Sequence, residues 1–121
     1  MNQFDVCRNV GPGRSKAPYF VIVQSNYFSK LNRRVVIPLV VLKPSAREFD
    51  AVLMPSFTVE NREVFLMTAD IFSIPASKLG ETVDSLLGSR DRIDDSLTWL
   101  THYASLRWCT DAVVAPADGI R

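Results

Sequence analysis

The sequence has little cysteine, a single histidine and no long apolar run. Its two cysteines, Cys7 and Cys109, lie at opposite ends of the 121-residue chain. They lack the spacing of a zinc site and indicate reduced cytosolic thiols, with a disulfide between them as the alternative. The one histidine, His102, cannot build a histidine-rich metal site. No apolar run is long enough to cross a bilayer, and residues 1–5 do not resemble a signal peptide. We therefore expect a cytoplasmic protein without a metal, a cofactor or a membrane partner.

The sequence also lacks an excess of charge of either sign. It has 14 basic and 13 acidic residues, which leave a formal net charge of +1. So small a net charge creates no strong positive field around phosphates, and we expect no direct sequence-specific binding of nucleic acid. The hydrophobic content of 47% is too high for a disordered chain. A chain of this length is long enough for one domain with a hydrophobic core.

Apolar residues recur at helical spacing near the C-terminus. Ser89 is a favourable N-cap, and Asp91 and Asp94 suit the positive end of a helix dipole. The stripe three or four residues apart consists of Ile93, Leu97, Leu100, Ala104 and Trp108. This spacing predicts a helix over about 89–108 with one buried face.

Short strands and turns are expected before this helix. The β-rich runs lie at 4–10, 19–23, 35–42, 52–59, 64–67 and 71–74, with a hairpin turn at 60–63. Pro38 cannot donate to a sheet ladder, so its strand is expected at an edge or with a bulge. The segment 76–87 has a turn at Gly80 and is then either extended or a short helix. These elements predict a mainly β fold with one C-terminal α-helix, as a largely antiparallel barrel or curled sheet. Residues 1–108 form the domain, and 109–121 are expected to be a flexible tail.

Residues for catalysis are sparse. Nothing pairs His102 with a particular serine and aspartate, as a catalytic triad requires. Arg8 could lower the pKa of Cys7, but a buried and inert strand cysteine is more common. The Gly11-Pro12-Gly13 segment lacks the Gly-Lys-Ser/Thr ending of a phosphate loop and predicts a turn. We therefore predict that the protein is not an enzyme.

Two further groups of side chains have both a structural and a functional interpretation. Arg33 and Arg34, with basic residues of the first loop, have two interpretations: a strip for RNA, or charges that keep loops and an edge strand in water, which is the favoured role. Trp99 and Tyr103 form an i, i+4 pair beside the apolar stripe. They indicate either a protein-binding surface or a broader buried face.

Several segments resemble the CcdB family of bacterial toxins. The most specific is Arg33-Arg34-Val35-Val36-Ile37-Pro38-Leu39, which includes the proline in mid-strand. Matching segments at 23–25, 67–70, 73–75 and 79–81, together with Val83, follow in the family's order and spacing. The similarity extends from about Phe4 to about Ala104.

The resemblance implies an SH3-like barrel of the CcdB, MazF and Kid type, with a C-terminal helix, that forms a homodimer. It further implies the toxin of a type II toxin–antitoxin module of the plasmid-maintenance kind. Such a toxin is an inhibitor of DNA gyrase, a type II topoisomerase. Its dimer wedges between two gyrase A subunits and traps the cleaved gyrase–DNA complex, without chemistry of its own. A CcdA-like antitoxin with a disordered tail would neutralise it.

The chain departs from the family pattern at the end of the helix. Family members end in Trp-Gly-Ile, where this chain has His102-Tyr103-Ala104 and then continues to residue 121. The family's gyrase-facing loop corresponds here to Tyr27 and Phe28. The candidate residues for binding gyrase or another partner are therefore Tyr27, Phe28, Trp99, His102 and Tyr103. The alternatives are a non-poisoning homologue with another target or a role as an antitoxin sink, and an endoribonuclease of the MazF or Kid type.

Overall fold

The computed structural model describes the backbone of residues 1–111 and the side chains of residues 1–102. Seven strands precede one long helix within this part of the chain. They are β1 (Asp5–Asn9), β2 (Tyr19–Ile22), β3 (Arg33–Val40), β4 (Ser56–Val59), β5 (Arg62–Leu66), β6 (Phe72–Pro75) and β7 (Leu79–Ser85), followed by α1 (Arg90–Asp111). The expected order of short strands and a C-terminal helix is confirmed. Residues 112–121 of the expected tail lie outside the described residues, and its first three residues continue α1.

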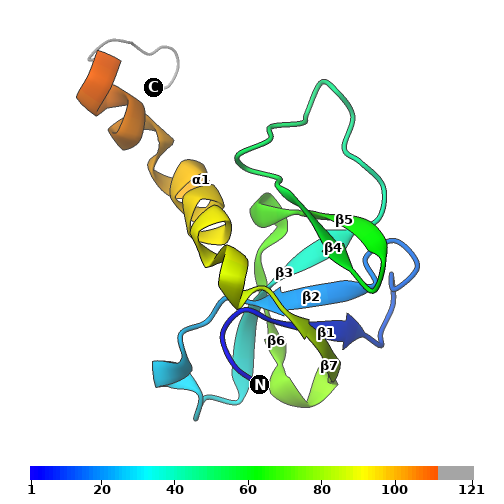
Figure 1. Ribbon diagram of the computed structural model, residues 1–121. Helices are drawn as coiled ribbons and strands as arrows, with labels where there is room; N and C mark the ends of the chain where they lie inside the picture. The colour runs from blue at the N-terminus through cyan, green and yellow to red at the C-terminus, as the bar shows by residue number, and fades with distance from the viewer. Residues whose placement is uncertain (112–121) are drawn as a thin grey trace.

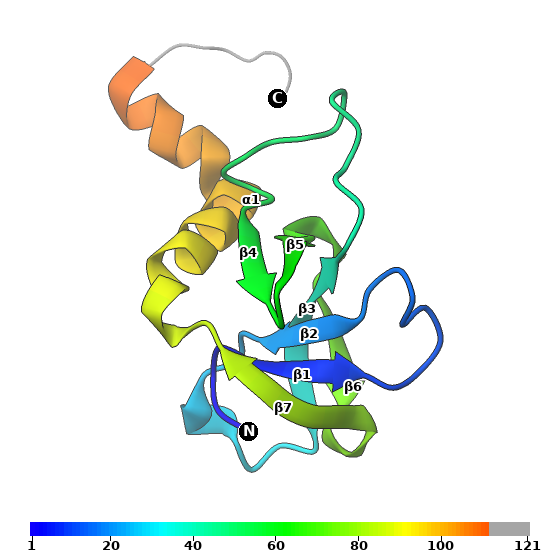
Figure 2. The same cartoon turned by 45° about the vertical axis from the view of Figure 1, so that its right-hand side comes forward.

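The strands form one curled antiparallel sheet, an open barrel across which α1 begins (Figures 1 and 2). Its hydrogen-bonded order is β4-β5-β3-β2-β1-β7, and β6 pairs with β3 beside this path. Every pairing is antiparallel. All four residues of β2 are buried, as its unbroken apolar run predicts. The mainly β barrel class is therefore confirmed. None of the helices in the described region is both long and apolar enough to span a membrane.

The strand that contains Pro38 is not at an edge, and its pairings show no bulge, so both alternatives of that expectation are wrong. β3 pairs with β2 on one side; on its other side it pairs with β6 through residues 33–36 and with β5 through residues 39–40. Pro38 lies where the partner changes from β6 to β5. Its carbonyl accepts a 3.0 Å bond from the Met67 N–H. The nitrogen and carbonyl of one residue point to the same side of an antiparallel strand. The proline nitrogen, which has no N–H, therefore lies on the side of β3 where pairing passes from β6 to β5, and it interrupts no regular run of ladder bonds.

Two other boundaries differ from the sequence expectation. The strand expected from residue 52 begins only at Ser56, because the Asp50 carboxylate accepts bonds of 2.9 and 3.0 Å from the Val52 and Leu53 N–H groups. These bonds form a turn in place of extended chain. The hairpin that follows is confirmed, but its turn has only two residues. Glu60 and Asn61 have φ values of 51° and 63°, the conformation that a two-residue turn matched to strand twist requires.

Gly80 lies within β7, and the expected turn at this position is wrong. A Cβ atom here would lie 2.8 Å from the carbonyl oxygen of Arg8 and 2.8 Å from Cγ1 of Val10. The glycine is therefore required by the close approach of β7 to β1, the strand with which it pairs. The rest of 79–85 is extended, which resolves the alternative of a short helix.

Replacing Gly80 by alanine is expected to lower the free energy of unfolding by about 1–3 kcal/mol, because the added methyl overpacks the β1–β7 contact. Gly88→Ala is the matched control, since a Cβ atom there would meet nothing within 4 Å. Urea unfolding of the two variants measures the difference. Equal stabilities would mean that β1 and β7 can move apart enough to accommodate the methyl without lowering the free energy of unfolding.

Within the residues whose side chains are described, the apolar stripe of α1 meets the barrel in the first turns of the helix. Ile93 is fully buried and Leu97 is partly buried against the main core, whereas Leu100 is 38% exposed. The hydroxyl of Ser96 is also buried; it donates to the Ile93 carbonyl at 2.7 Å and lies 3.2 Å from Oγ1 of Thr68. The side chains of the later stripe residues, Ala104 and Trp108, lie outside the described residues. Beyond the barrel, α1 projects away from the sheet (Figure 1).

Candidate protein-binding surface

The most exposed aromatic residues lie on a turn between β2 and β3. The single-turn helix η1 (Asn26–Phe28) begins after Ser25, whose hydroxyl accepts from the Tyr27 N–H at 3.1 Å. Tyr27 is 87% exposed and Phe28 is 50% exposed. Their rings meet edge to face, with centroids 5.0 Å apart. Both candidates are therefore exposed, and they form a contacting pair.

Leu31 extends this apolar surface, and the sequence interpretation missed it. It is 56% exposed, and its N–H donates to the Phe28 carbonyl at 3.1 Å. We call residues 26–31 the aromatic turn. A cluster of exposed apolar side chains on one short turn is typical of a site that another protein covers. The signal available in the sequence was the placement of large apolar residues between polar ones in a loop.

The candidates on α1 have different environments. Trp99 is partly buried, and its Nε1 donates to the Asp50 carboxylate at 3.1 Å. It thereby joins α1 to the long loop between β3 and β4. Of the two interpretations of Trp99, this contact favours a broader buried face of the helix over an exposed protein-binding surface. His102 is exposed and has φ −132° and ψ 23°, so α1 is kinked at this residue. The side chain of Tyr103 lies outside the described residues.

The structure does not bring these candidates into one patch on a single copy of the chain. In both ribbon views the aromatic turn, in light blue, lies at the opposite end of the molecule from the C-terminal half of α1 (Figures 1 and 2). Tyr27 and Phe28 form one surface, and the region of Trp99 and His102 forms another. Sequence spacing cannot reveal this separation, because it depends on how the sheet curls.

The two arginines considered for an RNA-binding strip donate to protein oxygens. Arg33 donates from Nε to Oγ of Ser73 at 2.7 Å and from Nη2 to its carbonyl at 2.9 Å. Arg34 donates to the backbone carbonyls of Ser29 and Leu31 in the aromatic turn and to its neighbour's carbonyl at residue 33. These contacts support a structural role for both residues and oppose the RNA strip.

A network of charged and polar residues around the β4–β5 turn was not predicted. Arg8 donates from Nη1 and Nη2 to the two Glu60 oxygens at 3.0 and 2.6 Å, and from Nε to Glu81 at 3.3 Å. The hydroxyl of Tyr19 donates to the same Glu60 carboxylate at 2.6 Å. Burial, and then the bond to Glu60, raise the pKa of Tyr19. The network connects the β4–β5 turn to β1, so its role is to hold the barrel's strands together.

Acidification is expected to remove the stability that Glu60 contributes. The Tyr19 hydroxyl, followed by the Arg8 guanidinium, holds the pKa of this carboxyl below its ordinary value of 4.5. The contribution is therefore complete above pH 4.5 and is lost as the pH falls through the folded-state pKa. Urea unfolding at stepped pH measures the effect, with Glu60→Gln as the variant without this titration. If both proteins lose stability equally on acidification, the network does not stabilise the fold through Glu60.

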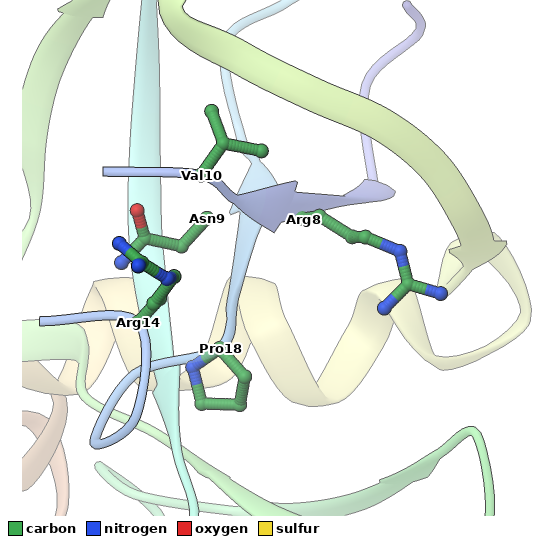
Figure 3. A pocket seen from close by; sticks show the side chains of 5 residues that line it. All are labelled: Arg8, Asn9, Val10, Arg14 and Pro18. Atoms are coloured by element: carbon green, nitrogen blue, oxygen red, sulfur yellow. The ribbon is translucent and has the colours of Figure 1, made fainter. Parts of the chain in front are cut away.

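The hollow beside this network is not a site for one concentrated negative charge. It has a volume of about 370 Å³ and is lined by Arg8, Asn9, Val10, Arg14 and Pro18. Figure 3 shows the Arg8 guanidinium pointing away from Arg14, so the two positive groups do not converge. Arg14 donates to the Gly11 carbonyl at 3.2 Å.

Cys7 has the character of an inert structural thiol. It is buried in β1, and its Sγ lies 3.7 Å from Oγ1 of Thr82. Burial raises the pKa of the Cys7 thiol, which keeps it protonated and unreactive. Cys109, its partner in the disulfide alternative, lies outside the residues whose side chains are described. Among the described residues, no three histidine, cysteine, aspartate or glutamate side chains gather as metal ligands do.

Comparison with known proteins identifies both a fold and a family. A solved structure described as an endoribonuclease in complex with its cognate antitoxin, from a mycobacterial species, has a TM-score of 0.64 and 15% identity. The alignment covers 81% of this chain and 91% of that chain. At this identity the similarity shows the fold alone. No curated protein is similar enough in sequence to match. The family model described as CcdB protein matches residues 3–102, which include all seven strands and the start of α1. The chain therefore belongs to the CcdB family.

Proposed function

We propose that this protein is the toxin of a type II toxin–antitoxin module and that it poisons DNA gyrase by binding its A subunit. The family match over residues 3–102 is the observation that carries the proposal. The chain acts in the cytoplasm by binding alone, without a cofactor, and a CcdA-like antitoxin neutralises it by covering its surface.

The proposed mechanism depends on shape and symmetry. Two copies of the chain form a homodimer, and each presents its own aromatic turn, with Tyr27 87% and Phe28 50% exposed. A two-fold symmetric wedge matches the two-fold arrangement of the gyrase A subunits. Because the wedge binds only the open, cleaved state, it shifts the gyrase population toward that state and prevents resealing.

The part of α1 around its kink at His102 is assigned a smaller part in this proposal. Trp99 donates to Asp50 within the same chain, so its indole N–H has a partner before any complex forms. His102 and Tyr103 stand in place of the Trp-Gly-Ile end expected from the family. We therefore assign the principal gyrase contact to the aromatic turn, and we retain His102 and Tyr103 as candidates at a second contact.

A gyrase cleavage assay tests the proposal. Purified protein is incubated with gyrase, supercoiled DNA and ATP, and linear DNA released by detergent and protease reports the trapped complex. We expect linear DNA to accumulate in proportion to the added protein, and premixing with the cognate antitoxin to prevent it. If no DNA is trapped and the protein does not bind purified gyrase A, the target assignment is wrong. Solution scattering that gives only monomers at micromolar concentration would refute the symmetric wedge.

Expression in bacteria, together with the purified protein, distinguishes the three alternatives. Growth arrest without gyrase binding would indicate a homologue with another protein target, and antitoxin binding without growth arrest would indicate an antitoxin sink. Cutting of single-stranded RNA would indicate an endoribonuclease. The bonds from Arg33 and Arg34 to protein oxygens argue against this last function, because RNA would have to displace them.

A further inference from the structure

We propose that Arg34 is a positioning residue that fixes the shape of the aromatic turn, with Gln24 as its partner. This inference rests on the proposed function, because it assigns the binding surface to that turn. Arg34 does not itself belong to the exposed apolar surface. It determines how rigidly that surface is presented.

The guanidinium of Arg34 donates hydrogen bonds to backbone carbonyls at the end of the aromatic turn and just after it. Nη2 donates to the Ser29 carbonyl at 2.9 Å. Nη1 donates to the carbonyls of Leu31 and, at 2.9 Å, Arg33. One planar side chain thus holds three alternate backbone oxygens with donors on two separate nitrogens, whereas the three donors of an ammonium all leave one nitrogen and lack this fixed spacing.

Gln24 holds the turn from its other end. Its Nε2 donates to the Phe28 carbonyl at 3.1 Å and to the Arg33 carbonyl at 3.2 Å, and its Oε1 accepts from the Val35 N–H at 3.1 Å. Phe28 is therefore fixed at its carbonyl, directly beside the exposed ring. Both side chains contact the Arg33 carbonyl, so Gln24 and Arg34 form one clamp across the base of the turn.

The partners of Arg34 indicate positioning, and they separate it from a role in charge attraction. All three are neutral backbone oxygens, and all three bonds are exposed to solvent. Losing exposed bonds costs the fold little, because water replaces the donor. It does free the turn to sample other conformations, and binding must then restore one of them at the expense of chain entropy.

The neighbouring Arg33 provides a matched control. It has the same charge and lies on the same strand, but its two bonds go to Ser73 on β6 and none goes to the aromatic turn. A substitution at Arg33 removes one positive charge from the same region without releasing the carbonyls of Ser29 and Leu31.

Amide hydrogen exchange and gyrase A binding together test the inference. The variants are Arg34→Gln, Arg34→Lys and Arg33→Gln in the full chain. In the free protein we expect both Arg34 variants to speed exchange at the Phe28, Ser29 and Leu31 amides, which donate within the turn. We expect both to weaken binding to purified gyrase A about tenfold, which corresponds to ordering about one more residue. Arg33→Gln should leave these amides unchanged, and all three variants should unfold at the wild-type urea concentration.

Each other outcome has a definite meaning. Unchanged exchange in the Arg34 variants overturns the inference, because the turn then keeps its shape without the clamp. Full binding by Arg34→Lys also overturns it, because charge would then suffice. Faster exchange with unchanged affinity overturns the link between turn order and binding. If wild-type protein does not bind gyrase A, the proposed function fails, while the exchange data still decide whether Arg34 positions the turn.

Discussion

Replacing Ile93 by alanine is expected to lower the free energy of unfolding by about 2–5 kcal/mol, the range for truncating a fully buried aliphatic side chain. Ile93 is completely buried and belongs to the main core cluster, which also contains Leu86 and Leu66. The loss combines the transfer energy of the removed atoms with the cavity left between α1 and the sheet. Because the start of α1 is attached through this residue, the variant should also loosen the docking of Trp99 on Asp50.

Leu100→Ala is the matched control for this prediction. Leu100 is an aliphatic residue of the same helix, but it is 38% exposed and lies beyond the part of α1 that packs on the barrel. Its truncation should cost about 1 kcal/mol or less. Urea unfolding monitored by tryptophan fluorescence measures both variants. A loss at Leu100 equal to that at Ile93 would show that the whole apolar stripe is buried, in conflict with the observed exposure.

Local pattern was sufficient to predict most of the elements. The unbroken apolar run at Tyr19–Val23 indicates a strand buried on both faces, and all four residues of the strand found there, β2, are buried. The helical spacing that includes Ile93 and Leu97 predicted α1, which begins one residue after the expected Ser89. Such patterns depend on residues a few positions apart, so they are visible without any tertiary structure.

Predictions that depended on the neighbouring strand were less successful. Pro38 indicated an edge or a bulge, because a proline within a regular ladder would break a bond; here β3 changes partner at that point. Gly80 indicated a turn, because glycine is common in turns; here it admits the carbonyl of Arg8. In both cases the residue type correctly indicated that the backbone at this position is unusual. The reason, a change of strand partner in one case and a close backbone contact in the other, depends on the three-dimensional structure.

The candidate surface was predicted in part for the same reason. Tyr27 and Phe28 were identified because large aromatics in a polar loop are conspicuous, and they are exposed. Their separation from Trp99 could not be inferred, since it depends on the curl of the sheet. The contact between Arg8 and Glu60 joins residues 52 positions apart and leaves no periodic signal.

The double substitution Tyr27→Ala, Phe28→Ala is expected to weaken binding to gyrase A by about 100-fold, because exposed aromatics that enter a partner's pocket carry a large share of binding energy. Both side chains project from a turn and contribute little to the core, so the free energy of unfolding should change by about 0.5 kcal/mol or less. Isothermal titration against purified gyrase A, with urea unfolding in parallel, separates the two effects. Trapped cleavage should fall together with affinity.

Leu42→Ala is the control for this second prediction, since Leu42 is 68% exposed on the loop that follows β3 and lies outside the aromatic turn. Its substitution removes exposed apolar surface of similar character and should leave gyrase binding unchanged. If the double variant binds as tightly as wild type, the aromatic turn is not the principal contact. His102, at the kink in α1, would then become the principal candidate, because it is the other candidate that is exposed among the residues whose side chains are described. One pair of affinities therefore decides which end of the molecule contacts gyrase.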